Sequence, residues 1–234
     1  MLKTKEAIIL AGGLGTRLKG VISDMPKPMA PVANQPFLKY IFDYLKQQGI
    51  ERVILSVGYK YELIEDFFGN NYEGLELVYS TENEPLGTGG GIRLAVDKLN
   101  GGQAFIINGD TFFDVNLLEF EKVAITENSD LCLALKPMQS FDRYGSVSLQ
   151  GSRIISFKEK QFMQEGLING GVYWFQKSLL EAFKSGEKFS FEQDLMEKQV
   201  DQKIISGFIS DTYFIDIGIP EDYAQANKDF AKRE

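Results

Sequence analysis

A short apolar run that stops at a cluster of glycines is the feature that most restricts how this chain can fold. Residues 7–10 read Ala-Ile-Ile-Leu, and glycines follow at positions 12, 13 and 15. Such a run is typical of a buried parallel strand that feeds a loop at the edge of a sheet. Because glycine has no side chain, backbone N–H groups in that loop can approach an anion closely. The pattern therefore predicts a phosphate site at the end of a strand.

Strands and helices are expected to alternate through the first half of the chain. The apolar spacing after the opening strand predicts a helix that begins at Pro36 and ends at Gly49. Further strands are expected at 53–57, 75–79 and 104–107, and helices at 62–68 and 91–99. This alternation predicts an α/β fold with a Rossmann-like, mixed but mainly parallel sheet and helices on both faces. Ligands of such sheets bind beyond the carboxyl ends of the strands.

The second half is predicted to be richer in strands. They are expected at 131–136, 145–149, 153–157, 172–175 and 213–217, with helices at 191–199 and 222–230. No linker or repeat divides the 234 residues, a length that suits one sizeable α/β domain. We therefore expect a single domain over residues 1–234, with a functional boundary near residue 115.

Composition narrows the classes of partner. The formal charge of −8 argues against nucleic acid and against an anionic membrane surface, because both are bound through many Lys and Arg contacts. The single cysteine, Cys132, excludes an internal disulfide framework and is expected in the core with Trp174 and Phe175. No signal peptide and no apolar stretch of about 20 residues is evident, so a cytoplasmic location is expected.

The chain contains no histidine. This absence removes the most common general base and the usual Ser-His-Asp arrangement. It also removes most zinc sites, since histidine is a frequent zinc ligand.

Three known types of glycine loop can be compared with residues 10–18. A dinucleotide-binding G-x-G-x-x-G is excluded because Leu18 stands where the third glycine belongs, and the strand at 53–57 lacks a terminal acidic residue. A P-loop is excluded because no Gly-Lys-Ser/Thr follows. A simple tight turn remains possible, although three glycines with Thr16 and Arg17 are more than a turn requires.

The segment 11–18, Ala-Gly-Gly-Leu-Gly-Thr-Arg-Leu, together with Pro26-Lys27-Pro28-Met29, resembles the signature of the sugar-1-phosphate nucleotidyltransferases. The likeness runs through almost the whole chain and implies a nucleotidyltransferase fold of the glycosyltransferase-A type. It also implies a nucleotide-binding half before about residue 115 and a small β-rich sugar-phosphate-binding half after it. Within the family, segments 84–90, 108–114, 141–145, 167–171 and 213–218 are most similar to members that join GTP to a heptose 1-phosphate.

The implied reaction is attack by the sugar-phosphate oxygen on the α-phosphorus of a nucleoside triphosphate, with pyrophosphate leaving. A phosphate monoester has a second pKa of about 6 and is already largely ionised at neutral pH, so no histidine base is needed. Cations and positioned donors are needed to bring two polyanions together. The resemblance assigns Arg17 and Lys27 to the triphosphate; for Lys27 alone, a solvated loop lysine is the alternative.

Two aspartates follow or interrupt apolar strands and are candidates for Mg²⁺. Asp110 comes just after residues 105–109, and Asp216 lies inside residues 213–217. A carboxylate in such surroundings is costly unless a cation or donors compensate it, and Mg²⁺ favours carboxylate and phosphate oxygens. The resemblance assigns the metal to these two positions and gives Asp110 a catalytic role. A turn or capping aspartate is the alternative for each.

The base and the rest of the nucleotide are expected to contact the two glycine-rich segments. Glu82 could accept from both N1–H and the amine of guanine, which favours GTP over UTP; a surface glutamate is the alternative. The nucleotide candidates are Leu10, Ala11, Gly12, Gly13, Gly15, Thr16, Glu82, Pro85, Gly87 and Thr88.

The resemblance places the sugar 1-phosphate in a second pocket. Lys160 would meet its phosphate and Glu159 its hydroxyls, but Gln161 replaces the proline that is common after them. The candidates for this pocket are Tyr144, Gly145, Glu159, Lys160, Asn169 and Gly170. Two alternatives stay open: a uridylyltransferase that acts on N-acetylmuramate 1-phosphate or glucose 1-phosphate, and a non-catalytic nucleotide-binding regulator.

Overall fold

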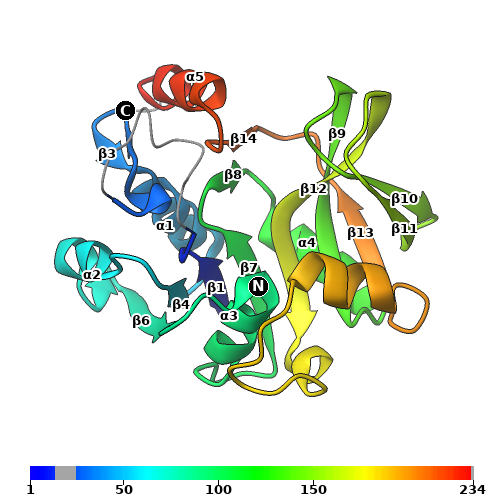
Figure 1. Cartoon of the computed structure of the whole chain (residues 1–234), viewed down its shortest axis with the longest axis horizontal. Coiled ribbons are helices and arrows are strands. Elements are labelled where there is room, and N and C mark those ends of the chain that lie inside the picture. Colours follow the sequence, from blue (N-terminus) through cyan, green and yellow to red (C-terminus); the bar gives the residue numbers. More distant parts are fainter. Residues whose placement is uncertain (14–24, 233–234) are drawn as a thin grey trace.

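A ten-stranded mixed sheet runs through the chain (Figure 1). The computed structural model describes residues 1–13 and 25–232. The strand order is β10-β11-β13-β9-β12-β7-β1-β4-β6-β5. Strands from both halves of the sequence belong to this one sheet, because β12 from the second half pairs with β7 from the first.

The centre of the first half is a parallel group of four strands. These are β1 (Glu6–Leu10), β4 (Arg52–Val57), β6 (Leu75–Thr81) and β7 (Gln103–Asn108). Ile8 of β1 pairs with Ile54 of β4 and Ile106 of β7, and all three are fully buried. β-Branched residues suit this position because helices cover both faces of a parallel sheet. The short β5 (Asn71–Tyr72) adds an antiparallel edge.

The second half pairs mainly in the antiparallel sense. Its strands are β9 (Leu131–Phe141), β10 (Ser146–Gln150), β11 (Arg153–Lys158), β12 (Met163–Gln176) and β13 (Ile205–Ile209). β12 pairs with β10 as well as with β9, so these five strands close on themselves in a ring of pairings. Only β13 and β9 run parallel in this ring. The sheet is thus mixed, as predicted. It is not mainly parallel, because the strands of the second half pair mostly in the antiparallel sense, and its parallel part lies mostly in the first half.

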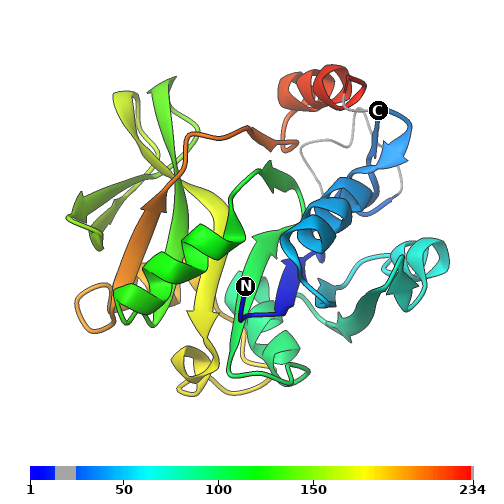
Figure 2. The same ribbon diagram turned by 180° about the vertical axis from the view of Figure 1, so that it is seen from behind.

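Helices cover both faces of the sheet, in separate hydrophobic clusters. The buried residues of α1 (Phe37–Gln48), α2 (Glu62–Phe68), α4 (Leu117–Thr126) and α5 (Pro220–Phe230) belong to one cluster. Those of α3 (Gly87–Val96) and of the π-helix η4 (Phe191–Glu197) belong to the other. Figure 2 shows α1 and α4 in front of the sheet, on the face that points away from the viewer in Figure 1. The predicted stop of α1 is confirmed: Gly49 adopts the left-handed conformation (φ 88°) that favours glycine.

Several short elements connect the layers. β8 (Thr111–Phe113) pairs with β14 (Phe214–Asp216) outside the main sheet, and β2 (Pro31–Val32) pairs with β3 (Gln35–Pro36). Two 3₁₀ turns are η2 (Lys27–Met29) and η3 (Lys177–Leu180). No helix in the described parts of the chain is long and apolar enough to cross a membrane.

Some predicted elements are wrong in extent, and several elements were not predicted. The helix expected at 91–99 begins at Gly87 and ends at Val96. The strand expected at 172–175 is the end of the much longer β12. The first part of β12 was not predicted because it contains glycines, which are unfavourable in strands. The helix α4 and the strand β13 had no strong signal in the sequence.

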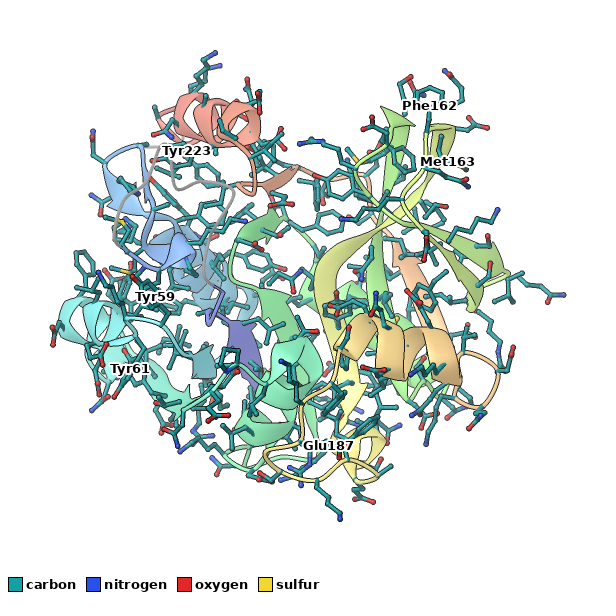
Figure 3. All side chains as sticks on the ribbon, viewed as in Figure 1. Tyr59, Tyr61, Phe162, Met163, Glu187 and Tyr223 are labelled. Carbon is teal, nitrogen blue, oxygen red and sulfur yellow. The ribbon has the colours of Figure 1, made fainter. Side chains whose placement is uncertain are left out.

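The glycines of α3 are explained by a close approach from the second half of the chain. The segment 187–191 crosses the first turn of α3, where Figure 3 labels Glu187. The carbonyl of Phe189 accepts from the N–H groups of Gly89 (3.0 Å) and Gly90 (3.3 Å). A Cβ on Gly89 would collide with the ring of Phe189. A glycine-rich helix start can bind a phosphate through its free N–H groups. Here the Phe189 carbonyl already occupies two of these N–H groups.

This packing predicts that Gly89→Ala is destabilising, although alanine by itself favours a helix. We expect a loss of about 1–3 kcal/mol in the free energy of unfolding, the usual cost of overpacking, measured by urea denaturation. The loss should be smaller when Phe189→Ala is already present, because the two side chains then no longer compete for space.

Gly102→Ala is a matched control, since a Cβ there would meet nothing within 4 Å. Equal losses for Gly89→Ala with and without Phe189→Ala would contradict the assigned contact.

Candidate functional site

A cavity of about 650 Å³ lies beyond the carboxyl ends of the parallel strands. Loops after β1, β4, β6 and β7 contribute to its wall, as expected for ligand sites of this type of sheet. The cavity is lined by seven of the predicted nucleotide residues: Leu10, Gly12, Gly13, Glu82, Pro85, Gly87 and Thr88. Lys27 and Asp110 line it as well.

Four further predictions concern the opening glycine loop. Ala11 is buried, and its N–H donates to the carbonyl of Ser56 (2.8 Å), which fixes the start of the loop against β4. Gly15, Thr16 and Arg17 lie outside the described residues. Their roles stay predictions.

Lys27 lies between the two aspartates that were predicted to share a cation. Its Nζ is 2.6 Å from Oδ2 of Asp110 and 3.7 Å from Oδ1 of Asp216. The Lys27 side chain is only 13% exposed. The N–H of Gly218 donates to the same Oδ1 of Asp216 (2.7 Å). Two like charges are thus held together by one ammonium group and one backbone donor.

The local backbone explains why these residues, distant in sequence, meet. Asp216 at the end of β14 pairs with Thr111 of β8, directly after Asp110. The N–H of Ile217 donates to the backbone carbonyl of Asp110 (3.0 Å). Lys27 begins the turn η2, and its flanking prolines restrict the backbone there.

The electrostatics of this group follow from burial. Burial and the charge of Asp110 raise the pKa of Asp216, and Lys27 with the Gly218 N–H only partly opposes them. Burial, followed by the charge of Asp216, also raises the pKa of Tyr144 to about 12, so Tyr144 is neutral at pH 7. Among the described residues, two carboxylates therefore share one ammonium group, and a further cation would relieve the excess of negative charge.

Glu82 shapes the loop that was predicted to hold the base. Its Oε2 accepts from the N–H of Leu86 (2.9 Å), and its Oε1 is 3.4 Å from Oγ of Ser56. A Cβ on Gly91 would lie 2.6 Å from Oε1, so this glycine makes room for the carboxylate. Glu82 thus borders the cavity and also holds the loop closed.

The predicted sugar-phosphate residues are only partly brought together, and none lines the described cavity. Tyr144 packs edge-on against Phe214, two residues before Asp216. Asn169 donates to the hydroxyl of Tyr173 (2.9 Å) and accepts from the N–H of Gly171 (3.0 Å).

Gly145 and Gly170 have packing reasons for lacking a side chain. A Cβ on Gly145 would lie 2.8 Å from the carbonyl of Lys158, and one on Gly170 would collide with the ring of Phe113. Glu159 and Lys160 are exposed on the connection from β11 to β12. Figure 3 labels the nearby Phe162 at the outer tip of this arm, away from the centre of the molecule.

Sequence reasoning missed several residues of the cavity wall. They are Pro28, Ser56, Gly58, Tyr59, Asn108 and Glu192, whereas Asn83 and Glu84 belong to the loop 82–90 that was expected to contact the base. Glu192 comes from η4, far away in the sequence. The one signal that could have placed it is the helix-start pattern Ser190-x-x-Gln193, in which the Ser190 hydroxyl accepts from the Gln193 N–H (3.1 Å).

Comparison with known proteins agrees with this geometry. The profile of the family described as "Nucleotidyl transferase" matches residues 6–233. The chain belongs to the nucleotidyl transferase family. The predicted family is thereby confirmed.

Individual relatives cover nearly the whole chain. This nucleotidyl transferase is 57% identical to the D-glycero-alpha-D-manno-heptose 1-phosphate guanylyltransferase of Aneurinibacillus thermoaerophilus, over 96% of the chain and 97% of the relative. It is 52% identical to the Campylobacter jejuni protein of the same name, over 93% and 96%. A crystal structure of HddC from Yersinia pseudotuberculosis complexed with GMP-PN is 37% identical, with a TM-score of 0.86 over 97% of this chain and 100% of that one. The predicted α/β nucleotidyltransferase fold is confirmed as well.

The raised pKa of Asp216 predicts that Asp216→Asn stabilises the ligand-free protein at neutral pH. Stability from a group with a raised pKa is complete below its unfolded value, about 3.9 for aspartate, and is lost as the pH rises through the folded value. The substituted side chain stays neutral at every pH. The Tm of Asp216→Asn should therefore exceed that of the wild type at pH 7 to 8, and the gap should close near the unfolded pKa.

Scanning calorimetry from pH 4 to 8 measures this gap. Asp201→Asn removes an exposed carboxylate and is the control. A Tm gap that is absent at pH 7 would contradict the electrostatic cost assigned to Asp216.

Proposed function

We propose that this protein transfers GMP from GTP to D-glycero-α-D-manno-heptose 1-phosphate, with release of pyrophosphate. The transferase chemistry is supported chiefly by Lys27 and its two aspartates at the edge of the nucleotide-sized cavity. The choice of substrates is supported by the two relatives at 57% and 52% identity, which carry this activity in their names. The neighbour whose structure contains GMP-PN also supports a guanine nucleotide.

The chain's residues suit a reaction that needs positioning more than proton transfer. The acceptor phosphate is largely ionised at neutral pH, so its oxygen can attack the α-phosphorus without a protein base. The bond from that phosphorus to the bridging oxygen breaks, and pyrophosphate leaves. Lys27 is proposed to neutralise the charge that develops on the phosphates, and Arg17 is its expected second cation. The backbone of Gly12 and Gly13 borders the same cavity and can approach the nucleotide closely.

Asp110 and Asp216 fit a Mg²⁺ ion. Their carboxylates already converge on one cation, the ammonium of Lys27, and oxygen ligands of this kind suit Mg²⁺. The ion would supply charge neutralisation at the α-phosphate. Asp110, as the carboxylate beside Lys27 in the cavity wall, is proposed to hold it next to the nucleotide, and Asp216 to complete the pair.

The acceptor is proposed to bind beside Asp216, on the side of Tyr144 and Asn169. Tyr144 lies against Phe214 of β14, and Asn169 lies on β12, which pairs with β7. The exposed Glu159 and Lys160 would contact the acceptor only if their connection moves toward the cavity. Movement of an exposed connection over a bound substrate is common among enzymes.

The direct test is pyrophosphate release with four nucleoside triphosphates, each combined with heptose, mannose, glucose and N-acetylmuramate 1-phosphates. We expect the highest kcat/KM for GTP with the heptose phosphate, and loss of turnover with a chelator that Mg²⁺ restores. Asp110→Asn should lose most of this turnover while its circular dichroism stays native. Turnover with UTP but not GTP would contradict the proposed nucleotide.

The role of Glu82 in choosing the base is tested by Glu82→Gln. Glutamine retains an acceptor for the Leu86 N–H, so the loop should keep its shape. It cannot accept from both donors of guanine as a carboxylate can. The ratio of kcat/KM for GTP to that for UTP should fall by about tenfold, the value of a hydrogen bond to a charged group.

Glu84→Gln is the matched control, because Glu84 also lines the cavity but is exposed. An unchanged GTP-to-UTP ratio in Glu82→Gln would limit Glu82 to holding the loop.

A further inference from the structure

Glu192 is a carboxylate in the wall of the nucleotide cavity that no predicted role uses. It belongs to η4, in the second half of the chain, whereas most of the cavity wall comes from the first half. Its neighbour across the wall is Thr88, in the first turn of α3. Among the described lining residues, Glu192 is therefore the one that comes from the second half of the chain.

The backbone at Glu192 is held firmly. Ser190 caps the start of η4 by accepting from the Gln193 N–H, and the N–H of Ser190 donates to Asp194 (2.8 Å). Phe191 is fully buried, and its ring packs edge-on against Tyr173. The N–H of Phe191 donates to Oγ1 of Thr88 (3.0 Å). These contacts fix the residues on either side of Glu192.

The carboxylate itself is oriented through one oxygen only. Oε2 accepts from the hydroxyls of Thr88 (2.6 Å) and Ser190 (3.0 Å). Oε1 accepts no hydrogen bond from residues 1–13 or 25–232. The result is a positioned acceptor at the cavity wall, with one oxygen available to a ligand.

The chemistry of the substrates limits what this oxygen can bind. A carboxylate repels the phosphates, and no group of three or more acidic, Cys or His residues that could hold a metal occurs in the described chain. A neutral donor remains, and hydroxyl groups are the donors that both proposed substrates carry. Tyr173, which packs on Phe191, receives a hydrogen bond from Asn169. Glu192 itself contacts Thr88, and its neighbour Phe191 packs on the tyrosine that Asn169 contacts.

We propose that Glu192 is a specificity-determining residue whose carboxylate accepts a hydrogen bond from a ring hydroxyl of a bound sugar. The hydroxyl belongs either to the ribose of the nucleotide or to the acceptor sugar, and the ribose is favoured because Glu192 lines the cavity of the nucleotide residues. This inference rests on the proposed function. It adds a residue that selects substrates by their hydroxyl groups.

The test pairs Glu192→Ala with substrates that lack single hydroxyls. Binding of GTP, 2′-deoxy-GTP and 3′-deoxy-GTP is measured by titration calorimetry, and KM is measured for the acceptor and its deoxy forms. We expect Glu192→Ala to weaken GTP by about ten- to a hundredfold, as for a lost hydrogen bond to a charged group. One deoxynucleotide should be bound equally by Glu192→Ala and the wild type. If the acceptor is the partner, the same pattern will appear in KM for one deoxy acceptor.

Two control variants separate this role from a structural one. Thr88→Val removes the hydroxyl that orients Glu192, and Glu197→Gln removes an exposed carboxylate from the same helix. The proposal would be overturned if Glu192→Ala weakened the binding of every substrate and analogue equally and Thr88→Val reproduced this effect. It would also be overturned if Glu192→Ala weakened the binding of none of them. Wild-type turnover of GTP with the heptose phosphate, run in parallel, reports separately on the proposed function.

Discussion

The shared ammonium of Lys27 is the interaction on which the arrangement of the site depends. Asp110 and Asp216 repel each other, and burial makes the ionised form of Asp216 costly. They are held together because β14 pairs with β8 and because Lys27 and the Gly218 N–H face them. A partly buried charge pair of this kind contributes little to stability by itself. Its value here is that two carboxylates and a lysine are already assembled where a polyphosphate and a cation would arrive.

The two halves of the chain are interdependent at the cavity. The first half supplies the parallel strands and most of the wall. The second half covers α3 through the carbonyl of Phe189 and adds Glu192 beside Thr88. The wall of the cavity therefore depends on Glu192, which lies 104 positions after Thr88 in the chain.

The parts of the fold that could be predicted are those with strong local periodicity. The strands β1, β4 and β7 are continuous apolar runs, and α1 has a clear apolar face and a glycine stop. The helix α4, which Asn116 caps by accepting from the N–H of Glu119, was not predicted. The start of α3 was misplaced because Gly87 to Gly91 disfavour a helix in isolation. Contacts from Phe189 compensate for that, and they cannot be read from neighbouring residues.

The sequence by itself determined the type of fold and the chemistry: the apolar run before Gly12, the Pro-Lys-Pro segment, the two aspartates and the absence of histidine. These are local features, and each can be interpreted without knowing how the rest of the chain folds. Only the tertiary structure decided which groups meet. It placed Lys27 between Asp110 and Asp216, gave Glu82 a role in closing its loop, and brought Glu192 into the wall. Strand pairing and helix packing bring these residues into contact. Such contacts cannot be read from the sequence, because the residues lie far apart in it.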